Sequence, residues 1–366
     1  MREPRYPAAR GAASRLEAHF AAEAGRAAAP PIEAAAIEAL VDAAFWASLQ
    51  REEGYAPEIS LAFLPPDEAV RPLRLAPPLP LGPRGLSRLA PAVERPGIHL
   101  GVWRAAGELV VWGTTRVVPP YCFVLEVVAP GLLVVKHRVR DDSAKFRNVA
   151  VFQGDEVKIL SREPTLAACD SRLLRPLLAP ESGDGDSDLL LRLAVSMRAH
   201  GRGGTLLVVP SGSDAWRESI AQPIAYAVEP AFGELAELLR EASPGDPDYA
   251  AVGRAVDALA GLTAVDGATL VTDRFELLAF GVKIARRDGR QRVERLSVSE
   301  PVEGAAAEVL APLQLGGTRH NSAAQFAQDQ KDAAALVASQ DGRFTAFAWS
   351  EREGMVHAHR VETLLL

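Results

Sequence analysis

The sequence predicts an α+β protein with two domains, and three observations support this fold class. The chain has 366 residues, which is enough to form two hydrophobic cores. Its first half contains three successive hairpin patterns, whereas its second half alternates apolar strands with helical patterns. We therefore expect an α+β accessory domain with antiparallel hairpins over residues 1–190 and an α/β domain with a mixed sheet over residues 191–366.

Composition and charge argue against several classes of protein. Hydrophobic residues make up 48% of the chain and charged residues 24%, which is typical of a folded globular protein. No apolar run reaches the ~18–20 residues of a membrane span, and the first residues show no secretory signal. The net charge is −7 and long Lys/Arg runs are absent, so we do not expect nucleic-acid binding.

The two cysteines, Cys122 and Cys169, each lie in or beside an apolar segment. We interpret them as buried, reduced thiols, with a metal pair or a disulfide as the alternative. Reduced thiols and the absence of a signal together predict a cytoplasmic location.

The first domain begins with two helical patterns, over residues 1–30 and 32–52, followed by a strand over 59–64. Residues 65–97 are rich in proline, so we expect an ordered but irregular connection with a short helix over 86–93; a flexible linker is the alternative. Glycine-containing turns then predict three hairpins, formed by the strand pairs 98–103 and 108–112, 123–128 and 132–136, and 148–152 and 156–160. Two helices are expected near residues 164–180 and 187–200.

The second domain starts with the buried strand pattern of residues 203–210. The remaining elements are expected as helices over 232–241, 250–260 and 322–331, a strand pair over 266–272 and 276–283, and a closing hairpin over 334–339 and 344–349.

Asp266-Gly267-Ala268 is the first candidate functional motif. It lies at the start of an expected strand, where small residues let a ligand approach the backbone. The Asp266 carboxylate could bind Mg²⁺ or Mn²⁺, or accept a proton from a ribose hydroxyl. The alternative is an ordinary turn aspartate before a strand.

The second motif runs from Gly316 to Ser322 and precedes an expected helix. Thr318 and Ser322 carry hydroxyl groups, and Arg319 can pair with two phosphate oxygens at once. The N-terminus of the following helix favours an anion. The alternative is a helix-capping segment whose Arg319 and His320 face solvent.

Together, Asp-Gly-Ala and Gly-Thr-Arg-His resemble the two signature motifs of the diadenylate cyclase domain superfamily. Members of this superfamily join two ATP molecules into cyclic di-AMP. The resemblance covers roughly residues 190–350, and the layout with a long N-terminal region resembles the DACNV group of predicted nucleotide sensors. The resemblance implies a C-terminal domain of the cyclase type, a divalent metal and domains that meet face to face as homodimers or higher oligomers.

The resemblance also assigns roles to individual residues. It implies that Asp266 is the catalytic and metal-binding acid. The expected nucleotide-binding residues are Asp266, Gly267, Ala268, Gly317, Thr318, Arg319, His320, Asn321, Ser322 and Ser339.

Two positions depart from the motifs of the family. Asn321 occupies a position where the family usually has arginine, and Ser339-Gln340-Asp341 stands where the family has Ser-Glu-Glu. The loss of one charged hydrogen bond costs roughly 1.5–3 kcal/mol, which binding tolerates better than catalysis does. We therefore expect a sensor that binds ATP or a signalling cyclic dinucleotide. The alternatives are an active diadenylate cyclase and a structural module that binds no ligand.

Two further patterns are weaker. Gly201-Arg202-Gly203-Gly204 is rich in glycine but precedes a strand, whereas a phosphate loop would open a helix. His357 and His359 would share one face of a strand and could bind a metal, but no further ligand lies nearby in the sequence, so we expect them to lie at the surface.

Overall fold

The computed structural model describes residues 5–24, 29–51, 54–139, 146–161, 171–178, 188–241 and 249–366. The chain divides into two compact units, Met1–Leu160 with Leu366 and Ser161–Leu365. Each unit has a mixed β-sheet and helices, in agreement with the α+β class expected from the sequence.

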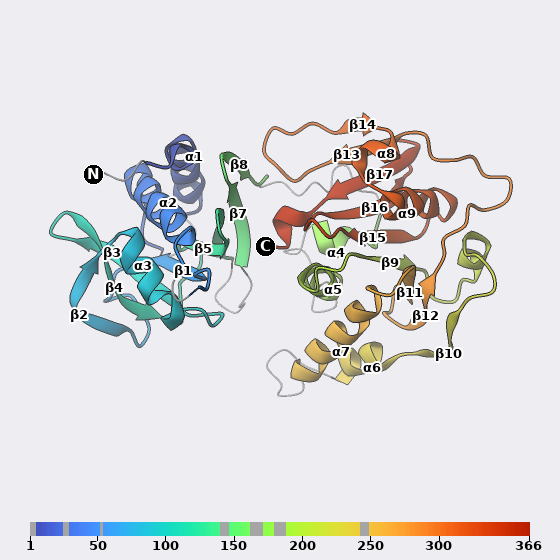
Figure 1. The fold of residues 1–366 in the computed structure, drawn as a ribbon, viewed down its shortest axis with the longest axis horizontal. Helices are drawn as coiled ribbons and strands as arrows, with labels where there is room; N and C mark the ends of the chain where they lie inside the picture. The colour runs from blue at the N-terminus through green and yellow to red at the C-terminus, as the bar shows by residue number, and fades with distance from the viewer. Residues whose placement is uncertain are drawn as a thin grey trace. The chain divides into compact units, whose positions relative to one another are not determined.

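The first unit is an eight-stranded sheet with helices against it (Figure 1). Its elements are α1 (Pro7–Ala24), α2 (Ala34–Ser48), β1 (Ile59–Phe63), β2 (Leu73–Pro80), α3 (Pro83–Leu89), η1 (Ala90–Ala92), β3 (His99–Ala105), β4 (Glu108–Thr115), β5 (Val124–Ala129), β6 (Leu132–Arg138), β7 (Phe146–Gln153) and β8 (Glu156–Ile159). The strand order is β2-β4-β3-β1-β5-β6-β7-β8, and β1 runs parallel to β3 while the other pairs are antiparallel.

The three expected hairpins of this unit form as β3–β4, β5–β6 and β7–β8. The helix α2 packs on β5 and β6 through an apolar face that includes Ile37, Leu40 and Val41, all fully buried. The proline-rich segment differs from its expected irregular form, because β2 pairs with β4 there. It can do so because β2 is an edge strand, where a proline costs no hydrogen bond on the open side.

The second unit is a nine-stranded sheet covered on both faces. Its elements are α4 (Arg175–Leu178), α5 (Asp188–Ala199), β9 (Gly204–Val209), η5 (Ala215–Ser219), β10 (Tyr226–Phe232), α6 (Glu234–Glu241), α7 (Tyr249–Leu262), β11 (Ala268–Thr272), β12 (Leu277–Val282), β13 (Leu296–Ser299), β14 (Glu308–Leu310), α8 (Pro312–Leu315), α9 (Thr318–Asp329), β15 (Ala334–Ala338), β16 (Phe344–Ser350), β17 (Met355–Arg360) and η6 (Glu362–Leu364). The strand order is β10-β12-β11-β9-β15-β16-β17-β13-β14, and the parallel pairs are β9–β11 and β13–β17.

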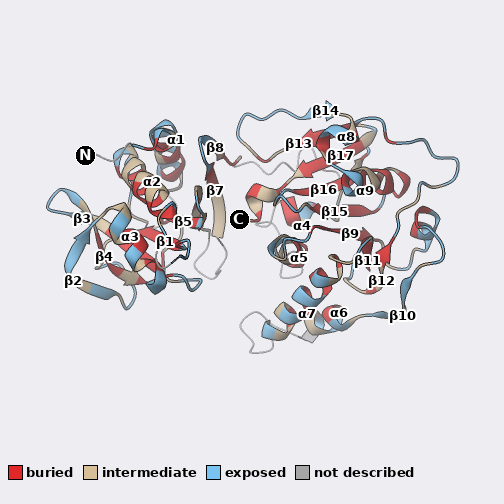
Figure 2. Ribbon diagram, in the orientation of Figure 1, coloured by how far each residue is buried: buried red, intermediate tan, exposed pale blue. Residues whose placement is uncertain are grey.

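Alternate residues of β9 enter two different cores of the second unit. Leu206 and Val208 pack with α5 and α7, whereas Leu207 and Val209 pack with α9 on the opposite face. Because both faces of the sheet are covered, β9 is buried at every position and its sequence is almost continuously apolar. Figure 2 shows the central strands of this sheet as buried. The sheet therefore lies between two helical layers.

The first unit ends at Leu160 and the second begins at Ser161, whereas the sequence predicts this boundary between residues 190 and 191. Leu174, Leu177 and Leu178 already belong to the core formed by α5 and α7. The expected helix over 164–180 is described only as α4, because residues 162–170 and 179–187 lie outside the described part of the chain. Cys169 lies there too, while Cys122 is a buried free thiol whose pKa is raised to about 12 by its burial.

Candidate functional site

The β11–β12 hairpin brings Asp266-Gly267-Ala268 next to the end of β12. Ala268 pairs with Val282, and a Cβ atom on Gly267 would lie 2.5 Å from the carbonyl carbon of Gly281. The φ angle of Gly267 is 127°, a value that other residues rarely adopt. Glycine is therefore required at this position by both backbone conformation and space.

Lys283 forms an ion pair with Asp266 at the mouth of this hairpin. Its Nζ donates to Asp266 Oδ2 at 2.7 Å and to the Asp266 carbonyl oxygen at 3.3 Å. The hydrogen bond and charge of Lys283, with a smaller contribution from Arg319, lower the pKa of Asp266. The carboxylate is therefore ionised at neutral pH, but the pair is weak because both side chains are largely exposed.

The helix α9 begins four residues earlier than the sequence predicts, at Thr318. Gly316 and Gly317 precede it in extended conformation, and the N-cap residue Gly317 offers no side-chain hydrogen bond to the first turn. The first backbone N–H groups of a helix lack partners within the helix. The N-terminus of α9 thus presents donors to an anion, together with the positive end of the helix dipole.

The Asp266 end of the β11–β12 hairpin and the N-terminus of α9 meet around a cavity of about 180 Å³. The cavity is lined by Thr205, Asp266, Gly267, Ala268, Val282, Lys283, Ile284, Thr318, Arg319 and Ser322. Six of these residues are candidates from the two sequence motifs, although the motifs lie about fifty residues apart. Carboxylate, ammonium, guanidinium and hydroxyl groups are therefore held around one small volume.

The other predicted residues do not line this cavity. Gly317 is the N-cap of α9 and Asn321 lies in its first turn, where the Asn321 N–H donates to the Gly317 carbonyl oxygen. His320 is buried, its ring lies 6.0 Å from that of Phe347, and burial lowers its pKa. Ser339 belongs to the β15–β16 turn, where its N–H donates to the Arg343 carbonyl oxygen.

The glycine-rich string before β9 makes room for Arg319. A Cβ atom on Gly203 would lie 3.0 Å from Arg319 Nη1 and 3.4 Å from Gln340 Cγ. Gly203 also has a φ angle of 71°. This string therefore contributes space for the guanidinium group, and it leads into the strand β9.

Sequence reasoning missed Thr205 and Lys283, which line the cavity, and an aromatic pair at Gly281. Lys283 directly follows β12, whose last residue pairs with the first residue of β11, so the expected pairing of these strands already brings Lys283 near Asp266. The rings of Tyr226 and Phe280 are stacked with centroids 4.9 Å apart, and Tyr226 is 50% exposed. Tyr226 lies on β10, an edge strand that the sequence did not reveal, and its ring packs against Gly281.

His357 and His359 lie in the sheet interior, not at a surface site. Their stacked rings share the hydroxyl group of Ser299, which lies 2.9 Å from His357 Nε2 and 3.0 Å from His359 Nδ1. Within the described residues, no group of three or more His, Cys, Asp or Glu side chains is arranged to hold a metal ion.

Comparison with known proteins finds a family match in the first unit. Residues 26–116 match the family described as probable sensor domain DACNV. The expected resemblance to the DACNV group and a sensor role thus receive support. The match ends well before Asp266, so the link to the diadenylate cyclase superfamily stays a prediction.

No curated protein matches this chain. Among solved structures, the chain is similar to a structure described as the hypothetical membrane spanning protein from Bacillus cereus. The identity is 19%, the match covers 53% of this chain and 71% of that one, and the TM-score is 0.27.

The name of that protein contradicts the cytoplasmic location expected from the sequence, and we withdraw this expectation. The name describes the similar protein alone. Among the residues described for this chain, no helix has both the length and the apolar character needed to span a bilayer.

Proposed function

We propose that the second unit binds a nucleotide through its phosphate groups and that the protein acts as a nucleotide sensor. The observation that carries this proposal is the meeting of the α9 N-terminus with Arg319 and Lys283 at one cavity. Helix N–H groups, a guanidinium and an ammonium group are the donors that phosphate sites use. The DACNV match in the same chain supports the sensor role.

The size of the cavity supports recognition of phosphates in particular. Its volume of about 180 Å³ is below the roughly 300–1,000 Å³ of typical small-molecule sites, so a whole nucleotide would not fit inside. In this proposal the phosphates occupy the cavity and the base stacks outside on Tyr226, beside Gly281. The candidates are ATP and a signalling cyclic dinucleotide.

A divalent metal ion would fit this site only if phosphate oxygens of the ligand bound it together with the protein. Asp266 is the one carboxylate among the described residues that line the cavity, and Mg²⁺ commonly binds one or two carboxylates together with substrate phosphates. The ion pair between Asp266 and Lys283 is exposed and weak, so it would not prevent the Asp266 carboxylate from binding the metal ion. When bound, the metal would offset the phosphate charge near Asp266.

Titration of the 366-residue protein with ATP by calorimetry tests the proposal through Arg319→Ala. A charged hydrogen bond is worth roughly 1.5–3 kcal/mol, so we expect the affinity to fall roughly 10–100-fold. The matched control is Arg274→Ala, an exposed arginine in the turn at the opposite end of the β11–β12 hairpin, which should bind as the wild type does. Equal affinities of all three proteins would contradict the proposal.

A further inference from the structure

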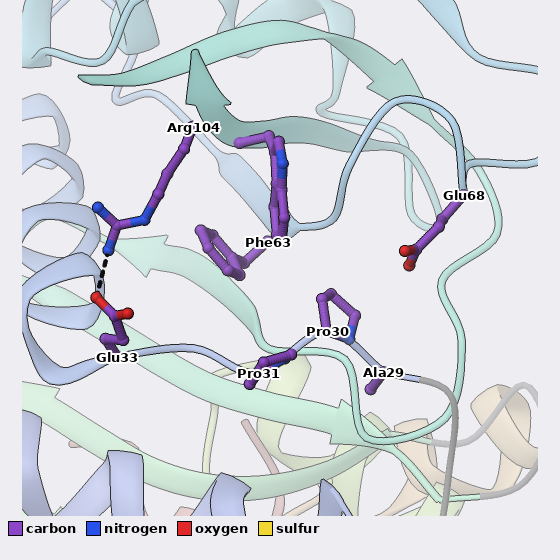
Figure 3. A pocket seen from close by; sticks show the side chains of 8 residues that line it. Ala29, Pro30, Pro31, Glu33, Phe63, Glu68 and Arg104 are labelled. Atoms are coloured by element: carbon purple, nitrogen blue, oxygen red, sulfur yellow. Dashed lines mark hydrogen bonds and ion pairs between the residues drawn. The ribbon is translucent and has the colours of Figure 1, made fainter. Parts of the chain in front are cut away.

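The first unit contains a second cavity, with a volume of about 520 Å³ (Figure 3). It is lined by Ala29, Pro30, Pro31, Glu33, Phe63, Glu68, Trp103 and Arg104. All of these residues fall within the segment that matches the probable sensor family. The volume lies within the roughly 300–1,000 Å³ range of small-molecule sites.

One wall of this cavity is aromatic. Phe63 ends β1 and Trp103 lies on the parallel neighbour β3, and their ring centroids are 4.6 Å apart at 43°. Phe63 is buried, which fixes the position of the wall, while Trp103 is partly exposed to the cavity. Such rings favour a flat apolar molecule, and their electron-rich faces also attract a cation.

Pro30 and Pro31 form a second apolar part of the lining, and Figure 3 shows them across the space from Phe63. Proline has no N–H group, so this part of the lining offers no backbone donor to an anion. It is also conformationally restricted, so little entropy is lost when a ligand packs on it.

The charges at the rim of the cavity favour a cation over an anion. Arg104 Nη2 donates to Glu33 Oε2 at 2.7 Å, and with Glu68 the lining has two carboxylates against one guanidinium group. Figure 3 shows Glu68 on the opposite side of the space from this pair. Within the described residues, the Glu68 carboxylate has no hydrogen bond or ion pair, and its charge is available to a ligand.

We propose that this cavity binds a small, flat aromatic molecule that carries a protonated amine. The aromatic body packs between Pro30 and the Phe63–Trp103 wall, and the ammonium group pairs with Glu68. The proposal is independent of the phosphate site in the second unit, whose charged groups select a ligand of the opposite sign. The segment that matches a sensor family would then have a ligand of its own.

Calorimetric titration of the 366-residue protein with three probes of similar size tests this proposal. The probes are phenethylamine, which is cationic, phenethyl alcohol, which is neutral, and phenylacetate, which is anionic. We expect phenethylamine to bind about tenfold more tightly than phenethyl alcohol, because both can donate to Glu68 but only the ammonium group adds a positive charge to that hydrogen bond. Phenylacetate should bind most weakly, since it meets the uncompensated Glu68 carboxylate.

Glu68→Gln keeps the size of the side chain and removes its charge, so it should abolish the preference for the amine over the alcohol. Glu94→Gln is the matched control: it makes the same change at an exposed position of the same unit outside the cavity, and the preference should persist. Trp103→Leu should weaken the binding of all three probes, and calorimetric unfolding verifies that each variant is folded.

Three results would overturn the proposal. These are the absence of binding by all three probes, binding of phenylacetate as tight as that of phenethylamine, and an equal effect of Glu68→Gln and Glu94→Gln on the amine.

Discussion

Three charged side chains, Asp266, Lys283 and Arg319, define the chemistry of the cavity in the second unit. Lys283 holds Asp266 ionised and also neutralises it, so Arg319 contributes the unbalanced positive charge. An anionic ligand is therefore attracted although the whole chain carries a net charge of −7. His320 does not add to this charge, because burial lowers its pKa and favours the neutral ring.

Another single residue, His99, makes the stability of the first unit depend on pH. It is buried on β3 and joined to Ser60 by a hydrogen bond of 2.7 Å. Burial lowers its pKa to about 4; the nearby Glu126 opposes this shift and Lys136 adds to it. Between pH about 6.5 and 4, the unfolded chain takes up a proton that the folded chain excludes.

We therefore expect the free energy of unfolding of the first unit to be unaffected by His99 protonation above pH about 6.5. As the pH drops to about 4, this free energy should fall by about 3 kcal/mol. His99→Gln should remove this part of the pH dependence. Scanning calorimetry of both proteins across the range is the measurement. Parallel curves of stability against pH for the two proteins would refute the assignment.

At the scale of elements, the hairpin β11–β12 sets the geometry of the candidate site. Its two strands are apolar segments separated by the short turn at Asp273 and Arg274, so the hairpin was predictable, and with it the approach of Lys283 to Asp266. The edge strand β2 was not predictable, because its prolines indicate irregular structure and only the pairing with β4 decides otherwise. The short strands β13 and β14 were missed because a three- or four-residue strand leaves little periodicity to detect.

A methyl group at Gly267 tests how tightly this hairpin is closed. Gly267→Ala should destabilise the second unit by roughly 2–4 kcal/mol, because its φ angle of 127° is strained for alanine and its Cβ atom would contact the Gly281 backbone. Gly289→Ala is the control, since its φ angle is also positive, at 74°, but no atom lies within 4 Å of its Cβ position. Denaturant unfolding of both variants measures the difference, and equal losses would show that the close approach is absent.

At the scale of the whole molecule, the chain contains two units with separate cores. Among the described residues, no hydrophobic cluster draws members from both units. Composition and length predict two domains, and the change of unit lies between residues 160 and 161. The leucines of residues 174–178 have a helical spacing that is compatible with either core, and only packing assigns them to the second.

We expect the two cores to respond separately to mutation. Phe123→Ala in the first unit and Phe326→Ala in the second each remove a fully buried ring and should cost about 3–5 kcal/mol. Calorimetry should show two transitions, of which each variant lowers a different one. A single transition that both variants lower equally would mean that the chain unfolds as one cooperative unit.

The central claim is that the second unit recognises phosphate groups at the cavity between the β11–β12 hairpin and the start of α9. The most direct measurement is the affinity of the wild-type protein for adenosine, AMP, ADP and ATP at one fixed salt concentration. The donors at the cavity predict that affinity rises with each added phosphate and that adenosine binds most weakly. If adenosine binds as tightly as ATP, or if none of the four binds, the phosphate site proposed here is wrong.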